Sequence, residues 1–187
     1  MINLTQTEQE QLLQLARRGL EAAAQELSLP ELDLARYSDL LQQPGASFVT
    51  LTIKGSLRGC IGSLNASRPL AEDVLQHGMD AAQDYRFPPV RPGELPSIHI
   101  EVSVLTKPVQ LEYDGPEELL EQLEPGRDGV VLQSGHQRAT FLPQVWEKVP
   151  DKTQFLQLLC QKALLDPDAW KNDGITIQTY QVVHVNE

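Results

Sequence analysis

The residues most able to do chemistry lie in one short segment, residues 55–63, which reads Gly-Ser-Leu-Arg-Gly-Cys-Ile-Gly-Ser. In a strand over residues 57–64, side chains alternate, so Arg58, Cys60 and Gly62 are expected on one face. Arg58 and Cys60 would then lie about 6.5–7 Å apart at the backbone, because each residue rises about 3.3 Å. A nearby cation lowers the pKa of a thiol and favours the nucleophilic thiolate. The spacing therefore predicts Cys60 as a nucleophile with Arg58 as its cationic partner.

The glycines of this segment suggest close approach to its backbone. Gly59 and Gly62 lack side chains, so a ligand or another chain segment can come near, and their amides could hold an oxyanion. The alternative is structural: Cys60 is a small buried hydrophobe, the glycines mark a β-bulge, and Arg58 is solvated. The residues alone leave both interpretations open.

A proton-transfer group for this thiol is less defined. None of the histidines pairs recognisably with Cys60 in the sequence; they are His77, His99, His136 and His184. His99 and Glu101 lie two apart on the polar face of a predicted strand, a geometry that suits a base with its orienting carboxylate. The alternative is an exposed polar strand face.

Binding groups elsewhere are few. Arg86 opens a segment with three prolines and is predicted as a second guanidinium for an anionic ligand. No HExxH motif, His/Cys cluster or calcium-loop pattern is present, so no metal site is predicted. No motif identifies a cofactor, and its identity stays unknown.

The elements that would position these residues alternate between helices and hairpins. Helices are predicted at residues 5–27, where Thr5 and Glu8 fit a capping box, at 69–83 and 116–123, and after Asp151. Strands are predicted at 46–53, 57–64, 98–105 and 175–185, with a hairpin over 126–142. This order favours an α+β fold, a largely antiparallel sheet flanked by helices with a smaller second lobe. The 187 residues suit one domain, with a cleft expected near residues 57–64.

Composition excludes several function classes. Fifteen basic against 26 acidic residues give a net charge of −11, which disfavours general nucleic-acid binding but permits a small anionic ligand at a local arginine cluster. No apolar run is long enough to span a membrane. The two cysteines lie far apart and no apolar N-terminal segment precedes them, so a cytoplasmic protein without disulfides is expected.

Several motifs together resemble one known family. They are Phe48-Val49-Thr50-Leu51, Leu57-Arg58-Gly59-Cys60-Ile61-Gly62, Arg86-Phe87-Pro88-Pro89-Val90, Glu101-Val102-Ser103-Val104-Leu105, residues 126–131, Phe141-Leu142-Pro143-Gln144-Val145 and residues 155–163. In order and spacing the chain resembles the AMMECR-one domain family of the AmmeMemoRadiSam system. The resemblance implies an α+β domain in which the Leu57–Gly62 segment borders a cleft, and a setting shared with Memo-like and radical S-adenosylmethionine proteins. It implies no settled reaction.

Three hypotheses follow. The first is an accessory or modifying component that uses Cys60 as thiolate and Arg58 as clamp, with Gly59 and Gly62 amides at an oxyanion and Glu101 or a histidine assisting proton transfer. The second is a non-catalytic module that holds a small anionic ligand or a peptide through Arg58 and Arg86. The third is a scaffold without a small-molecule site.

Overall fold

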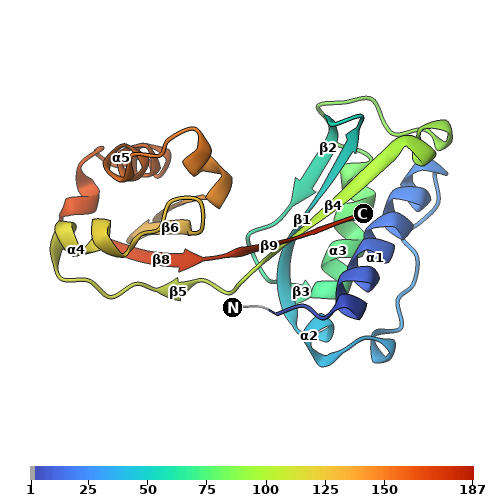
Figure 1. Cartoon of the computed structure of the whole chain (residues 1–187), viewed down its shortest axis with the longest axis horizontal. Helices are drawn as coiled ribbons and strands as arrows, with labels where there is room; N and C mark the ends of the chain where they lie inside the picture. The colour runs from blue at the N-terminus through green and yellow to red at the C-terminus, as the bar shows by residue number, and fades with distance from the viewer. Residues whose placement is uncertain (1–2) are drawn as a thin grey trace. The chain divides into compact units, whose positions relative to one another are not determined.

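The chain forms two compact units in a computed structural model that describes residues 3–187 (Figure 1). Unit 1 comprises the residues up to Thr106 together with Val183–Glu187, and unit 2 comprises Lys107–Val182. Unit 2 is therefore inserted in the sequence of unit 1. Each unit has its own sheet and its own apolar core.

Unit 1 contains a five-stranded sheet of order β2-β1-β4-β9, with β3 paired to β1. Its strands are β1 (Pro44–Ile53), β2 (Ser56–Gly62), β3 (Arg68–Pro69), β4 (Ile98–Leu105) and β9 (Val182–Asn186). Its helices are α1 (Gln6–Ala24), α2 (Asp39–Gln42) and α3 (Leu70–Ala81), with the 3-10 turns η1 (Leu34–Arg36) and η2 (Pro92–Ser97). The β1 pairings with β2, β3 and β4 are antiparallel.

The two long helices of unit 1 pack side by side and contact the central strands (Figure 1). They approach closely because small residues meet: a Cβ on Gly19 would lie 2.1 Å from the Leu75 carbonyl oxygen, and one on Gly78 would lie 2.3 Å from that of Ala16. The N-terminus of α1 is fixed by the capping box predicted from the sequence, in which Thr5 and Glu8 bond each other's backbone N–H groups. That prediction is confirmed.

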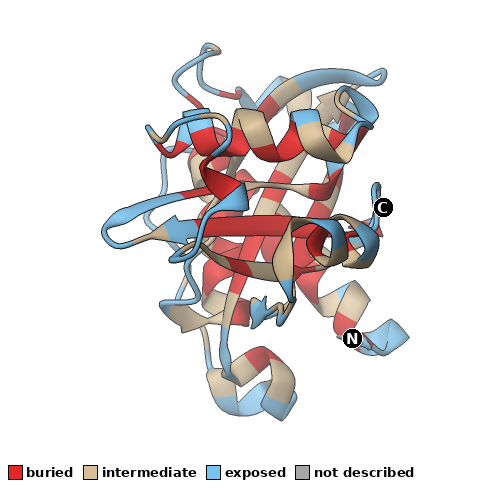
Figure 2. Cartoon of the chain, turned by 90° about the vertical axis from the view of Figure 1, so that its left-hand side faces the viewer, coloured by how far each residue is buried: buried red, intermediate tan, exposed pale blue. Residues whose placement is uncertain are grey.

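The unit 1 sheet has one apolar and one polar face. Alternate residues of β1 and β4 are fully buried in the core with α1 and α3; they include Val49, Leu51, Ile100 and Val102. The residues between them, such as Thr50 and Glu101, are only partly buried. Figure 2 shows the buried, half-buried and exposed positions along the chain. The period of two thus assigns Thr50 and Glu101 to the polar face.

Unit 2 contains a four-stranded sheet of order β5-β8-β6-β7. Its strands are β5 (Val109–Gln110), β6 (Gly129–Ser134), β7 (Gln137–Phe141) and β8 (Thr176–Tyr180). Its helices are α4 (Gly115–Gln122) and α5 (Lys152–Lys162), with the 3-10 turns η3 (Pro143–Glu147) and η4 (Ala169–Lys171). In its core the Trp146 ring stacks on Phe155 with centroids 3.5 Å apart.

The predicted α+β class with antiparallel sheets flanked by helices is confirmed. The single closing strand predicted over residues 175–185 is wrong. The chain leaves one sheet after Tyr180 and enters the other at Val182, so β8 pairs in unit 2 and β9 in unit 1. The helix predicted from Pro69 begins one residue later, because Pro69 is part of β3. Within residues 3–187, no helix is both long and apolar enough to cross a bilayer.

Candidate functional site

Cys60 lies in β2, the edge strand of the unit 1 sheet, directly opposite Thr50 of β1. Its side chain is half-buried, and its Sγ lies 3.3 Å from the Thr50 Oγ1. Thr50 in turn lies opposite Glu101 of β4. The pairing therefore places Cys60, Thr50 and Glu101 in one row across the polar face of three adjacent strands.

Arg58 does not follow the alternation predicted for residues 57–64. A β-bulge shifts the register, so that Gly59 pairs with Leu51 while Leu57 pairs with Thr52. Arg58 is the extra residue, and its guanidinium forms a two-pronged ion pair with Glu94 of η2, with Nε–Oε1 and Nη2–Oε2 distances of 2.8 and 3.1 Å. The sequence predicted a regular strand with Arg58 as the cationic partner of the thiol. Instead, Arg58 lies in a bulge and its guanidinium pairs with Glu94.

The guanidinium that contacts Cys60 belongs to Arg86. Its Nη2 donates to the Cys60 carbonyl oxygen at 3.2 Å, while the carboxylate of Asp84 accepts from the Cys60 N–H at 2.9 Å. Arg86 and Asp84 also bond each other, with the shortest contact at 2.6 Å. Together they occupy both outward-facing backbone groups of an edge-strand residue, as a neighbouring strand would.

Asp84 is completely buried and charged. The Arg86 guanidinium, reinforced by the Cys60 and Arg86 N–H groups, holds the pKa of Asp84 well below its ordinary value despite burial. The pKa of Arg86 is raised by the same pair. Sequence reasoning missed Asp84, because a single aspartate after a helix carries no signal of burial; the only hint is its position two residues before Arg86.

The two glycines around Cys60 allow close approach by the chain itself. A Cβ on Gly59 would lie 2.1 Å from the carbonyl oxygen of Ala81, at the end of α3. A Cβ on Gly62 would lie 2.3 Å from the ring of Phe48, which sits opposite Gly62 on β1. Packing therefore explains why neither position carries a side chain.

A second polar group lies further along the same face. His184 of β9 contacts Glu101 and Ser103 of β4, its Nδ1 lying 3.2 Å from Glu101 Oε1 and 3.1 Å from Ser103 Oγ. The histidine that contacts Glu101 is thus His184, while His99 is exposed on β4, as the alternative of an exposed polar strand face expected. Residues two apart on a strand are neighbours on one face, but a partner 83 residues away cannot be read from spacing.

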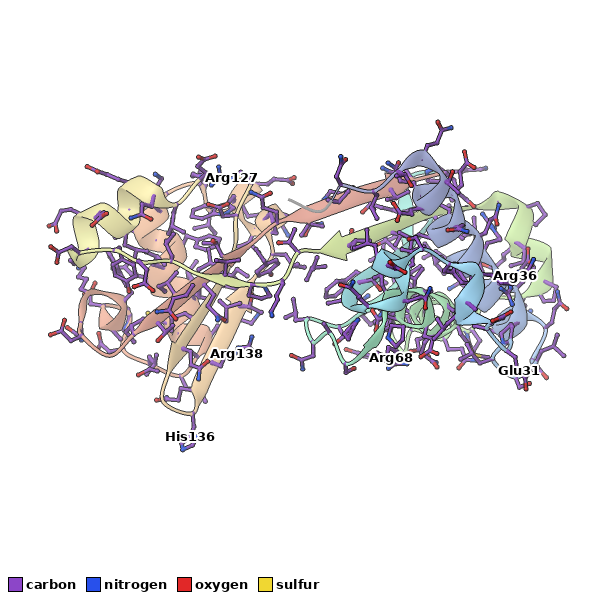
Figure 3. The ribbon with its side chains drawn as sticks, turned by 90° about the horizontal axis from the view of Figure 1, so that it is seen from below. Glu31, Arg36, Arg68, Arg127, His136 and Arg138 are labelled. Carbon is purple, nitrogen blue, oxygen red and sulfur yellow. The ribbon has the colours of Figure 1, made fainter. Side chains whose placement is uncertain are left out.

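The other histidines lie elsewhere. His77 is buried in α3, where its Nδ1 contacts both Ser47 and Asp73. His136 lies in the turn between β6 and β7 of unit 2 and points away from the hairpin (Figure 3). Within the described part of the chain, no three His, Cys, Asp or Glu side chains are arranged to hold a metal ion.

The row of Cys60, Thr50 and Glu101 on the polar face does not bring a base into contact with the thiol. Adjacent strands lie about 4.8 Å apart, so the backbone of Glu101 is roughly 10 Å from that of Cys60, and His184 lies one strand further. Direct proton transfer needs heavy atoms within about 3 Å. Neither Glu101 nor His184 is hydrogen-bonded to the thiol, whose only side-chain hydrogen bond within residues 3–187 is the one to Thr50.

Comparison with known proteins identifies the family. The AMMECR1 family model matches residues 13–185, which span both units. The chain belongs to the AMMECR1 family. A relative from Methanothermobacter thermautotrophicus is 38% identical over 183 residues, covering 95% of this chain and 93% of the relative. A relative from Thermofilum pendens is 37% identical over 182 residues, covering 91% and 85%.

The AMMECR1 fold is also found in a crystal structure. Uncharacterized protein PH0010 from Pyrococcus horikoshii is 32% identical to this chain and superimposes with a TM-score of 0.73. The match covers 92% of this chain and 88% of PH0010. The resemblance inferred from the Leu57–Gly62 motif and its companions is therefore confirmed at the level of family and fold.

Proposed function

We propose that this AMMECR1 protein is a cytoplasmic accessory or modifying component that works with Memo-like and radical S-adenosylmethionine proteins, and that the Cys60 thiol is the group it presents to them. The observation that carries the proposal is that the Cys60 thiol is the least occupied group of the Leu57–Gly62 motif. Every other chemically notable group there has a partner in the chain itself.

The partners are specific. Arg58 is held by Glu94, Gly59 admits the Ala81 carbonyl, and Gly62 lies under the Phe48 ring. The backbone of Cys60 is held by Asp84 and Arg86. What remains is a half-buried sulfur whose one side-chain hydrogen bond, to a hydroxyl, is weak and easily exchanged.

The surrounding residues take supporting roles in this proposal. Arg58 and Arg86 are positioning residues that fix the edge strand, in place of the anion clamp expected from the sequence, because each already has a carboxylate partner. Glu101 and His184 offer a polar contact further along the face for the molecule that meets the thiol. Such a molecule would have to bring its own base or leaving group, since no base among the described residues of unit 1 contacts the sulfur.

Selective alkylation tests the proposal. In the native protein we expect iodoacetamide at neutral pH to modify Cys60 at least about tenfold faster than Cys160. Cys160 is fully buried in α5, and burial raises the pKa of its thiol, so its thiolate is scarce. Peptide mass mapping after timed quenching measures both rates, and urea-unfolded protein, in which both thiols should react alike, is the control. Equal and slow modification of both thiols in the native protein would contradict the proposal.

A second candidate, a non-catalytic module that binds a small anionic ligand or a peptide, is favoured by the absence of a base in contact with the sulfur within residues 3–187. In this second candidate the Cys60 thiol touches the bound molecule but does not react with it. Binding of a purified Memo-like protein from the same organism should then survive Cys60→Ser, and no covalent adduct should appear by intact mass. If Cys60→Ser still folds and still binds the Memo-like protein, but no longer supports the activity of the combined proteins, the first candidate is supported.

A further inference from the structure

Unit 2 carries a hollow of about 270 Å³ that plays no part in the proposal for Cys60. It lies between two connections of this unit, the one from β5 to α4 and the one from η4 to β8. Residues 110–116 form one wall and residues 170–177 the other. Its volume is close to the lower end of small-molecule sites, about 300 Å³.

The lining of the hollow carries an excess of negative charge. Glu112, Asp114 and Asp173 are exposed, and none of their carboxylates forms an ion pair within residues 3–187. The one cation of the lining, Lys171, is already paired with Asp168, with Nζ 2.7 Å from Oδ1. The hollow therefore favours a positively charged ligand.

An independent observation points to a ligand here. Trp170 is one of the residues that line the hollow and is only 2% exposed, yet its indole N–H has no acceptor in the described chain. The other tryptophan, Trp146, donates to the Asp128 carbonyl oxygen at 2.7 Å. An unpaired buried donor is costly, so a carbonyl that reaches the Trp170 indole gains a hydrogen bond that the protein does not supply.

An organic cation fits this lining better than a metal ion does. Within residues 3–187 the acidic side chains are not grouped to hold a metal ion. The Lys171 ammonium lies 5.3 Å from the centre of the Trp170 ring, which shows that this indole face already accepts a cation. Lys171 is exposed, so its side chain can swing aside as a ligand enters.

We infer that this hollow binds a ligand that combines an ammonium or guanidinium group with a carbonyl. The cation meets the carboxylates of Glu112, Asp114 and Asp173, and the carbonyl accepts from the Trp170 indole. A free carboxylate on the ligand would be repelled by the same three carboxylates, so the carbonyl is an uncharged one, such as that of an amide. Two sources share this chemistry: a small arginine or lysine amide, and a basic side chain within a peptide.

Nuclear magnetic resonance of the full ¹⁵N-labelled chain tests the inference. Titration with N-acetyl-argininamide should shift the indole N–H signal of Trp170 and leave that of Trp146, whose acceptor is internal, in place. The matched probe N-acetyl-citrullinamide has the same shape without the charge and should leave both signals unmoved. If the neutral probe shifts Trp170 equally, or if neither probe shifts it at millimolar concentration, the inference is wrong.

Removing the negative charges of the hollow is a second test of the inference. The triple variant Glu112→Gln, Asp114→Asn, Asp173→Asn changes exposed residues and should weaken binding of N-acetyl-argininamide about tenfold or more. A control with the same change of net charge, Glu21→Gln, Glu121→Gln, Glu147→Gln, alters exposed residues outside the hollow and should bind as the wild type does. Equal affinity of the triple variant and the wild type would overturn the inference.

The source of the ligand is separated by comparing the amide with the peptide Ala-Ala-Arg-Ala-Ala, capped at both ends. About tenfold tighter binding of the peptide assigns the site to a basic segment of a protein. Equal affinities assign it to a ligand of single-residue size. Binding of neither probe contradicts the inference and leaves the proposal for Cys60 untouched, since that proposal concerns unit 1 alone.

Discussion

Replacing Gly59 by alanine is expected to lower the free energy of unfolding by about 3 kcal/mol or more, one of the largest effects of any single methyl group in unit 1. The added Cβ would lie 2.1 Å from the carbonyl oxygen of Ala81. That atom is backbone at the end of α3, so it cannot rotate away, and either β2 or the helix end must move. Thermal unfolding should show a midpoint about 6–12 °C lower.

The matched control is Gly93→Ala. Gly93 has no positive φ, and a Cβ there would meet nothing within 4 Å. Its midpoint should therefore stay close to that of the wild type. A Gly59→Ala protein as stable as Gly93→Ala would mean that the end of α3 does not press against β2 as described.

The second large effect is expected for Asp84→Asn, which should cost about 2–3 kcal/mol. The asparagine has nearly the same size, but its NH₂ group would face the Arg86 guanidinium, so two donors would meet where a carboxylate now accepts. Removing one partner of a buried ion pair costs about 3–5 kcal/mol, and the figure is reduced here because Arg86 is half-exposed. Chemical denaturation at neutral pH measures the loss.

The dependence on pH distinguishes charge from shape. The pKa of Asp84 is lowered in the folded protein, so its contribution to stability is complete above the ordinary aspartate value of about 3.9 and is lost as pH falls below it. The stability difference between wild type and Asp84→Asn should be constant from pH 5 to 8 and shrink in more acidic solution. The exposed control Asp39→Asn should change stability by less than about 0.5 kcal/mol. A difference independent of pH down to 2 would contradict a charged Asp84.

Local sequence patterns predicted most of the elements, because the relevant forces act over short distances. The alternation of residues 98–105 gave β4 its apolar and polar faces, and Thr5 with Glu8 marked the start of α1. The break between β8 and β9 had no such mark. No glycine or proline stands between Tyr180 and Val182, and the split arises only because the two halves pair with different sheets.

The candidate site was predicted in part. Cys60 and the two glycines were singled out by type and spacing, but the partners that define their environment come from distant segments: Asp84 and Arg86 at the backbone of Cys60, Glu94 at Arg58 and His184 at Glu101. The structural alternative expected a β-bulge at the glycines, and one is present beside Gly59. The sequence did not show that Arg58 would be the extra residue. The roles of Cys60, Arg58, Gly59, Gly62, Arg86 and Glu101 toward a ligand or partner stay predictions.

The insertion of unit 2 between β4 and β9 has a consequence for biosynthesis. On the ribosome, every residue of unit 2 is made before Val183–Glu187, which complete the sheet of unit 1. Unit 2 can therefore fold before unit 1 is complete. Until β9 is synthesised, the part of unit 1 up to Thr106 has an unpaired β4 edge. Stalled or shortened nascent chains of this protein should for this reason depend more on chaperones than the finished chain does.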